Sequence, residues 1–375
     1  MIRKILVATD SFKGSLSAPE ACRVIAAQAE LVFPETEIVR LPISDGGEGL
    51  VEVVLKALGG ERKTVHTSDP LSRQIIADYL QLPGGSALIE MAGAGGLTLL
   101  DSGEYDPLRT STYGVGLMIL DAVNAGADPI YVGLGGSATV DGGTGAATAL
   151  GMHFLDAKGE KITSGGGLGS IQSLDLSKMR ELKYSGKLIF LTDVTNPLCG
   201  PNGAAQIFGP QKGATPEQVH LLDQGLGSLA DLISHIAGQD LLDLPGIGAA
   251  GGFALPFVAF IGAEIRSGID FVLDVLKFDQ ELVGTDLVIT GEGRTDAQSA
   301  MGKAISAVAR RAHEADVRVA VISGALGEGA EKMLSLGVDD LVQATPPGQS
   351  LEEALAHAAE NLANAARNYL MGLQS

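Results

Sequence analysis

The 375-residue sequence contains no tryptophan and only two cysteines, and acidic residues far outnumber basic ones. Cys22 and Cys199 are too few for a disulfide framework and have no metal-binding spacing, which indicates reduced thiols in a cytoplasmic protein. The 26 basic and 45 acidic residues give a formal net charge of −19. This charge disfavours nucleic acids and anionic membrane surfaces as partners.

Long hydrophobic runs are also missing. The longest apolar stretch, at 251–263, contains Pro256 and is too short to span a membrane. The first residues read as a strand and lack the apolar segment and cleavage site of a secretion signal. We therefore expect no membrane partner and a cytoplasmic location.

Glycine and small aliphatic residues dominate what is present. Glycine occupies 51 positions, hydrophobic residues make up 45% and aromatic residues only 4%, a balance typical of α/β proteins with closely packed backbones. A chain of this length exceeds what one hydrophobic core usually organises, so we expect two domains.

Strand and helix patterns alternate at both ends of the chain. Apolar runs at 4–7 and 37–43 predict strands, each followed by a turn and an amphipathic helix. Such β-turn-α units indicate a parallel sheet. The same order returns downstream, with strands expected at 286–290, 317–324 and 339–345 and helices at 50–58, 303–315 and 350–370.

The last predicted helix has a long apolar stripe that includes Leu351, Leu355 and Leu362. Ser350 followed by Glu353 forms a capping box at its start. We expect this stripe to be packing surface and no part of a site.

A different pattern lies between the two ends. Strand-like runs at 73–82 and 86–91 are separated by Pro-Gly-Gly, which predicts an antiparallel hairpin. We therefore predict a parallel-sheet α/β domain made of residues 1–67 and 283–375, with an inserted mixed-sheet α/β domain over residues 68–282.

The segment GLGGSATVDGGTGAA at 133–147 joins a short apolar strand to a predicted helix. Backbone N–H groups in such a glycine-rich turn can bind phosphate, helped by the helix dipole. The segment lacks the third glycine of the dinucleotide fingerprint and the lysine of a P-loop. It is a candidate anion site, and a plain tight turn is the alternative.

Further turns at predicted strand ends concentrate charged side chains, at 8–18, 44–49, 190–214 and 290–303. Their carboxylates could hold Mg²⁺ or orient a hydroxyl, and the mixed charges of the last turn suit an anion with its metal. The Gly-Lys pair in that turn is followed by Ala304 and is no Walker motif. Ordinary turn and capping chemistry is the alternative for the others.

Together these turns favour phosphoryl transfer over acyl or hydride transfer. A kinase binds a polyphosphate, Mg²⁺ and an acceptor hydroxyl, and most of its catalysis is positioning and charge neutralisation. The histidines, including His66, His153 and His220, have no metal spacing and no partnered nucleophile, so we expect them on the surface or in packing.

The motifs also match a known family: the chain resembles the bacterial class II glycerate kinases of the glycerate 2-kinase type. The resemblance runs through nearly the whole chain. The matching segments are DSFKGSLSA (10–18), SDGGEG (44–49), DPLSR (69–73), IEMAGAGGL (89–97), RTSTYGVG (109–116), GGSATVDGG (135–143), TDVTNPLCGPNGAAQIFGPQKGA (192–214), GAAGGF (248–253) and TGEGRTDAQSAMGK (290–303).

The resemblance implies two α/β domains, one Rossmann-like and one inserted, with the active site in the cleft between them. It implies ATP- and Mg²⁺-dependent phosphorylation of D-glycerate on the 2-hydroxyl, giving 2-phosphoglycerate and ADP, by a monomer or homodimer. Two positions depart from the family pattern. Val140 replaces an expected Asn, which affects one polar contact beside Asp141, and Ser72 replaces an expected Gly, which affects a turn.

Residue roles follow from the same resemblance. Lys13 would neutralise the carboxylate of glycerate or the transferring phosphate, and Arg73 or Arg294 would clamp the carboxylate. Asp193 or Asp296 would be the base on the acceptor side. The candidates are Lys13, Asp45, Asp193 and Asp296 as catalytic residues; Asp10, Ser11, Glu48, Arg73, Arg294 and Ser299 for substrate; Gly135, Gly136, Ser137, Asp141, Gly142 and Gly143 for the nucleotide; and Asp193 and Glu292 for metal.

Two alternative functions remain open. The same scaffold could phosphorylate the 3-hydroxyl of glycerate or another small hydroxy acid. It could also bind a nucleotide or anion without turnover, although the acidic positions that turnover needs are present. Hydride transfer is disfavoured because the dinucleotide fingerprint is missing.

Overall fold

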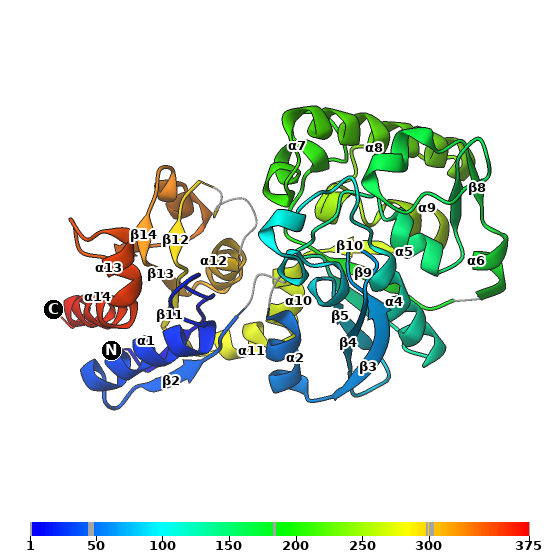
Figure 1. Cartoon of the computed structure of the whole chain (residues 1–375). Coiled ribbons are helices and arrows are strands. Elements are labelled where there is room, and N and C mark those ends of the chain that lie inside the picture. Colours follow the sequence, from blue (N-terminus) through cyan, green and yellow to red (C-terminus); the bar gives the residue numbers. More distant parts are fainter. Residues whose placement is uncertain (1, 44–48, 183–184, 298, 300–303, 375) are drawn as a thin grey trace. The chain divides into compact units, whose positions relative to one another are not determined.

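The computed structural model describes residues 2–43, 49–182, 185–297, 299 and 304–374. The chain divides into two units, which we describe separately (Figure 1). Unit 1 consists of Met1–Asp45 and Ile269–Ser375, and unit 2 consists of Gly46–Gly268.

Unit 1 is built around a five-stranded parallel sheet with the strand order β15-β13-β11-β1-β2. In β1, Ile5, Leu6 and Val7 are all fully buried, so both faces of the sheet are covered. One face packs against α1 and α14, whose Ile25 and Leu362 share an apolar cluster with Ile5. The sheet strands and covering helices are β1 (Lys4–Val7), α1 (Ala18–Val32), β2 (Glu37–Arg40), β11 (Leu287–Thr290), α12 (Ala304–Glu314), β13 (Arg318–Ser323), β15 (Asp340–Gln343), α13 (Leu351–Ala356) and α14 (Ala358–Gly372).

Smaller elements complete unit 1. The short strands β12 (Arg294–Thr295) and β14 (Ala325–Leu326) pair in parallel beyond the ends of β11 and β13. A 3₁₀ segment follows at Ala330–Leu336, and α10 (Gly268–Val275) and α11 (Phe278–Leu282) precede β11.

Unit 2 contains a six-stranded mixed sheet with the order β10-β9-β6-β5-β4-β3. The first four strands in this order run parallel, and β4 pairs antiparallel with both β5 and β3. The strands are β3 (Glu61–Ser68), β4 (Gln74–Gln81), β5 (Ala87–Glu90), β6 (Ile130–Gly133), β9 (Leu188–Leu191) and β10 (Glu264–Arg266).

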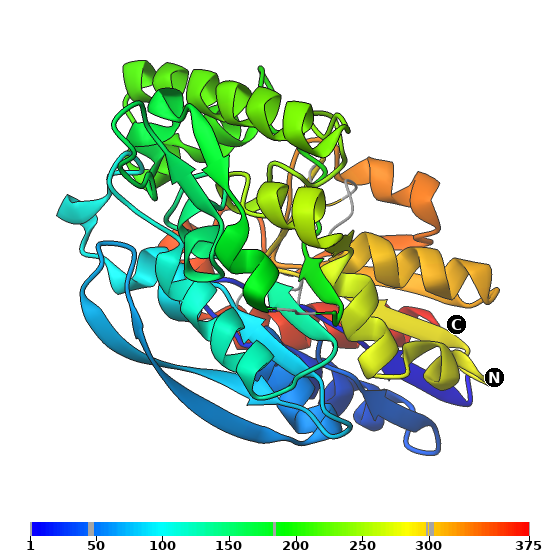
Figure 2. The ribbon, with the colours of Figure 1, turned by 90° about the vertical axis from the view of Figure 1, so that its right-hand side faces the viewer.

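Helices pack around this sheet, and the long helix α8 runs along one side of unit 2 (Figure 2). The core contains an aromatic cluster in which Phe190 meets Phe253 edge to face at a centroid separation of 5.4 Å. The remaining elements are α2 (Leu50–Leu58), α3 (Ala92–Gly95), α4 (Tyr113–Asn124), α5 (Thr144–Ala149), β7 (His153–Leu155), β8 (Ser173–Asp175), α6 (Ser177–Leu182), α7 (Ala204–Phe208), α8 (Pro216–Ala237) and α9 (Leu255–Ile261).

This architecture confirms the predicted fold class of a parallel-sheet α/β domain and a separate mixed-sheet α/β domain. The boundaries differ from those expected at residues 67 and 283. Residues 49–67 lie in unit 2 because β3 pairs along its whole length with β4, which belongs to the mixed sheet. Among the described residues, no helix is both long and apolar enough to cross a membrane.

The C-terminal helix expected at 350–370 is two helices, because the backbone leaves the helical conformation at His357. The capping box of Ser350 and Glu353 is present. The apolar stripe is packing surface only in α14, where Leu362 is buried. In α13, Leu351 is 76% exposed, so the expectation that it is packing surface was wrong.

Ser72 lies in the tight turn between β3 and β4 with a φ of 66°, in the left-handed region. Its N–H donates to the carbonyl of Asp69 at 3.0 Å, and the N–H of Asp69 donates to the carbonyl of Arg73 at 2.9 Å. A residue with a Cβ is strained in this conformation, which would account for the glycine that the family resemblance leads us to expect here.

Replacing Ser72 by glycine is expected to stabilise unit 2 by about 1 kcal/mol, because the left-handed strain is relieved. The melting temperature should rise by roughly 2–4 °C. Ser173→Gly in strand β8 is the matched control, and it should lower stability because glycine there only adds chain entropy. A melting temperature that falls in both variants would contradict the assignment of strain at Ser72.

Candidate active site

The carboxyl ends of β1, β11 and β13 meet at one edge of the sheet in unit 1, where ligand sites of open α/β sheets lie. The backbones approach so closely that side chains do not fit. A Cβ on Gly291 would lie 1.9 Å from the carbonyl oxygen of Ile322, and one on Gly324 would lie 2.5 Å from that of Gly293. The N–H of Asp10 donates to the carbonyl of Gly291 at 3.0 Å.

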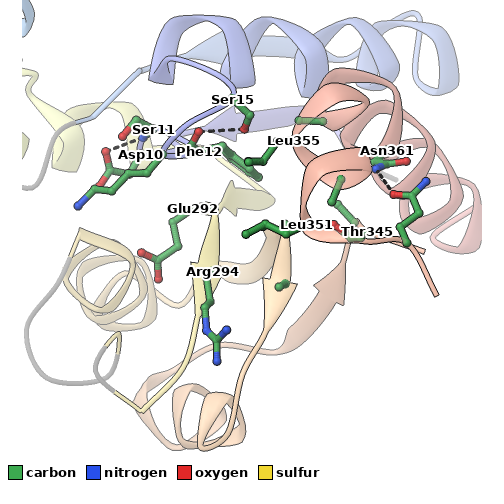
Figure 3. A pocket seen from close by; sticks show the side chains of 18 of the residues that line it. Asp10, Ser11, Phe12, Ser15, Glu292, Arg294, Thr345, Leu351, Leu355 and Asn361 are labelled. Carbon is green, nitrogen blue, oxygen red and sulfur yellow. Dashed lines mark hydrogen bonds between the residues drawn. The ribbon is translucent and has the colours of Figure 1, made fainter. Parts of the chain in front are cut away.

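A cavity of about 490 Å³ opens at this edge (Figure 3). Several residues predicted from the sequence line it together, although they come from distant parts of the chain. These are Asp10, Ser11, Lys13, Glu292, Arg294 and Asp296. The structure therefore brings both predicted anionic and predicted cationic groups to the same place.

Glu292 is held by two hydroxyl groups. Ser299 donates to its Oε1, and Thr295 donates to the same oxygen at 3.4 Å. Thr295 is also hydrogen bonded to Ser323 at 2.7 Å, and both side chains are fully buried. The side chain of Ser299 is fully buried as well and orients Glu292, and the predicted role of Ser299 as a substrate ligand stays a prediction.

The other charged groups of this cluster differ in exposure. Asp10 is only 8% exposed, and its Oδ1 accepts from the N–H of Ser11 at 2.6 Å. Arg294 is largely exposed, with its Nε 3.5 Å from Oδ2 of Asp296. In Figure 3 the carboxylate of Glu292 lies on the same side of the cavity as Asp10, whereas the guanidinium of Arg294 points away from both.

The donor set fits Mg²⁺ in the way kinases usually bind it, through one or two carboxylates with substrate phosphates as further ligands. Asp10 and Glu292 both line the cavity and are the carboxylates that could hold such an ion. Among the described residues, no group of three or more His, Cys, Asp or Glu side chains is arranged as a complete metal site. The predicted residues Asp45 and Glu48 lie outside the described residues.

The glycine-rich segment in unit 2 is organised around Asp141, whose side chain is fully buried. It accepts hydrogen bonds from the N–H of Thr112 at 2.8 Å, from its hydroxyl at 2.7 Å, and from the N–H groups of Gly143 and Gly145 at 3.1 and 3.3 Å. Burial raises the pKa of Asp141, while these hydrogen bonds act in the opposite direction. These contacts hold the loop in place, and the nucleotide-binding role expected of Asp141 stays a prediction.

Gly142 and Gly143 are packed closely against their neighbours, and the nucleotide-binding role expected of them stays a prediction. A Cβ on Gly142 would lie 2.5 Å from Leu229 of α8, and one on Gly143 would lie 2.1 Å from the carbonyl oxygen of Phe253. Both have positive φ. Gly135 and Gly136 form the accessible part of the loop, next to Ser137.

Lys212 is a feature of this loop that the sequence candidates omitted. Its side chain is 2% exposed, and its Nζ donates to Oγ of Ser137 at 2.7 Å and to the carbonyl of Thr139 at 2.6 Å. Burial lowers the pKa of Lys212 to about 7, and the carboxylate of Asp141 partly counters this. Its position between Gly and Pro residues was visible in the sequence, but its burial was not.

The remaining predicted residues in unit 2 have internal partners. Arg73 forms ion pairs with Asp69 and Glu104, and the hydrogen bond that its guanidinium donates to Asp69 is the main reason that the pKa of Arg73 is raised. Asp193 follows β9, and its Oδ1 accepts from the hydroxyl of Ser267 at 2.8 Å. Val140 is fully buried in the apolar core beside Asp141.

The fold and the charged cavity together define an α/β protein with an anion-handling site of the kind that phosphotransferases use. The family model of the glycerate kinase family matches residues 5–374. The "Glycerate 2-kinase" of Escherichia coli (strain K12) is 40% identical over 367 residues, which cover 97% of this chain and 96% of that protein.

Two further comparisons agree. The "Glycerate kinase" of Bacillus subtilis (strain 168) is 40% identical over 97% of this chain and 96% of that protein. A crystal structure of a candidate glycerate kinase 2 from Salmonella typhimurium LT2 superposes with a TM-score of 0.82 at 40% identity, covering 100% of this chain and 99% of that one. The chain belongs to the glycerate kinase family and is a phosphotransferase, which confirms the resemblance.

Replacing Lys212 by methionine should change how stability depends on pH. The pKa of Lys212 is about 7 in the folded chain and 10.5 ordinarily. Between pH 7 and pH 10.5 the unfolded state therefore binds more protons at this residue than the folded state does. Wild-type stability should therefore rise with pH relative to Lys212→Met, by at most about 1.4 kcal/mol per unit. Below pH 7 the difference between the two proteins should be constant.

Thermal or urea unfolding of both proteins from pH 6 to 9 measures this difference in stability. Groups that titrate alike in the two proteins contribute equally to both and cancel in the difference. Lys332→Met, an exposed lysine in unit 1, is the matched control and should follow the wild type at every pH. Parallel curves for wild type and Lys212→Met would show that the buried amine does not titrate in this range.

Proposed function

We propose that this protein transfers the γ-phosphoryl group of ATP to the 2-hydroxyl of D-glycerate, giving 2-phosphoglycerate and ADP. Membership of the glycerate kinase family and the printed name of the Escherichia coli relative, glycerate 2-kinase, support the substrate and the position. The observation that carries the proposal is the cavity in unit 1, where three carboxylates and two cationic side chains line a site at the ends of parallel strands.

Each group of this cavity has a place in the chemistry. Lys13 and Arg294 would neutralise negative charge on the phosphates or on the carboxylate of glycerate. Asp10 and Glu292 would hold Mg²⁺, and the hydroxyls of Ser299 and Thr295 fix the carboxylate of Glu292 for that purpose. Mg²⁺ would supply charge neutralisation at the phosphate oxygens.

Asp296 would be the base on the acceptor side in unit 1, where it lines the cavity beside Arg294. Asp193 is the other proposed base, and its hydrogen bond from Ser267 would orient it. Arg294 is a better carboxylate clamp than Arg73, because Arg73 is bound to Asp69 and Glu104. Asp45 and Glu48 keep their predicted roles in positioning metal or substrate.

In unit 2, we propose Gly135, Gly136 and Ser137 as an anion site. The two glycines are accessible, and Lys212 donates to Oγ of Ser137, which leaves the Ser137 hydrogen able to point to a ligand. Lys212 is thus a positioning residue for this loop.

³¹P NMR of the full chain with ATP, Mg²⁺ and D-glycerate tests the proposal. We expect a growing 2-phosphoglycerate signal with wild-type protein. Lys13→Met should lower kcat/KM by about 100-fold or more, because a charge that stabilises the transferring group is lost. Lys332→Met, which removes an exposed lysine elsewhere in unit 1, should retain the wild-type rate.

Other outcomes separate the alternatives. A 3-phosphoglycerate signal would overturn the position of phosphorylation but keep the kinase. Faster turnover of a different hydroxy acid would overturn the substrate. A folded protein that binds ATP but phosphorylates none of these acceptors would contradict the enzymatic proposal and favour a binding protein.

A further inference from the structure

The cavity in unit 1 changes in chemical character along its length. The charged side chains gather at the ends of β1 and β11, as described above. Beyond them lie Phe12, Leu351 and Leu355, followed by Gln349 and Asn361 at the far end (Figure 3). A ligand that fills this cavity would therefore be charged at one end, apolar in the middle and able to hydrogen bond at the other end.

The two leucines are unusually placed for apolar side chains. They stand four residues apart on α13 and so lie on the same helix face. Leu351 is 76% exposed and Leu355 is 39% exposed, although both line the cavity. The break at His357 separates this face from α14, which packs on the sheet, so α13 covers no core of its own.

The far end of the cavity carries two amides. Nδ2 of Asn361 donates to Oε1 of Gln349 at 2.9 Å, and Asn361 is only 7% exposed. This bond uses one of the two Nδ2 hydrogens and leaves the NH₂ group of Gln349 available to donate. Side-chain amides pair well with the edge of adenine, which presents both an acceptor and a donor.

D-Glycerate matches only the charged end. Each of its three carbons carries oxygen, so it has no apolar surface for Phe12 and the two leucines to cover. A volume of about 490 Å³ lies in the range of sites for larger ligands. A nucleotide has the required order of groups, with polyphosphate, sugar and an apolar base that carries hydrogen-bonding edges.

We propose that the apolar half of this cavity binds the adenine base of the nucleotide, with Leu351 and Leu355 against the face of the ring and the amides of Gln349 and Asn361 at its edge. The nucleotide phosphates then extend to Lys13, Asp10 and Glu292. The nucleotide thus binds in unit 1, and the glycine-rich loop of unit 2 does not hold the base.

This inference rests on the proposed function only in taking ATP as the phosphoryl donor, and a binding experiment without turnover tests it. Calorimetric titration of the full chain with ADP and, separately, with inorganic tripolyphosphate distinguishes the base from the phosphates. The variant is Leu351→Asn with Leu355→Asn, which keeps side-chain size. Because Leu351 is mostly exposed, its replacement removes little buried apolar surface.

We expect the Kd of ADP to rise at least about tenfold in this variant, since the base loses its apolar contacts. The Kd of tripolyphosphate should stay within about twofold of wild type. Leu334→Asn is the matched control, because Leu334 is 50% exposed in the same unit and does not line the cavity. It should bind both ligands like wild type.

A second variant guards against misfolding of the first. Ala354→Phe fills the cavity from the same helix and should weaken ADP binding without creating exposed polar groups in place of leucine. Unchanged ADP affinity in both variants would overturn the proposal, as would equal loss of ADP and tripolyphosphate binding. So would a change only in oligomeric state, which would assign the leucines to a contact with a second copy of the chain.

The two proposals fail differently. Selective loss of ADP binding in a protein that phosphorylates no hydroxy acid would support the base site and contradict the proposed function. Phosphorylation of glycerate with wild-type ADP affinity in the variants would contradict the base site alone.

Discussion

The site in unit 1 depends on how closely three strand ends can approach. Gly291 and Gly324 leave no room for a Cβ against the neighbouring backbone, and a Cβ on Gly293 would lie only 3.2 Å from the backbone nitrogen of Lys13. The carbonyls of Glu292 and Gly293 accept from the N–H groups of Gly324 and Ala325 at 3.1 Å. This contact fixes the direction of the chain between Glu292 and Asp296. The carboxylates on that segment therefore meet Asp10 and Lys13 from the end of β1.

The fold was largely predictable, because the spacing of apolar residues and the length of each apolar run determine it. Apolar runs of four to six residues in β1, β11 and β13, each followed by a turn and a helix, admit few arrangements other than a parallel sheet. The boundary between the two domains was harder to predict. No strand was expected from the sequence at 61–68, and the pairing of β3 with β4 assigns these residues to unit 2.

The candidate site, too, could be predicted from the sequence only in part. Charged residues after strands could be found from the sequence, because strand ends in a parallel sheet converge. The burial of individual side chains could not be predicted. Burial distinguishes Ser299, which holds Glu292, from Ser11, which lines the cavity. It also separates Gly142 and Gly143, which pack against α8 and Phe253, from the accessible Gly135 and Gly136.

In one case that bears on function, the helical spacing of apolar residues gave a wrong prediction. Leu351 and Leu362 belong to one continuous apolar stripe in the sequence, yet the break at His357 places one in a cavity and the other in the core. Such a break depends on a single residue's backbone angles, which no pattern of apolar residues reports. The buried Lys212 is a similar case, since its partners Ser137 and Thr139 lie more than seventy residues away.

On this assignment, the nucleotide binds at the strand ends of unit 1. A crystal structure of the full chain with Mg²⁺ and a non-hydrolysable ATP analogue tests it most directly. We expect density for the triphosphate beside Asp10, Lys13 and Glu292, with the base against Leu351 and Leu355. Density for the whole analogue on the Gly135–Ser137 loop of unit 2, with the cavity of unit 1 empty, would contradict it.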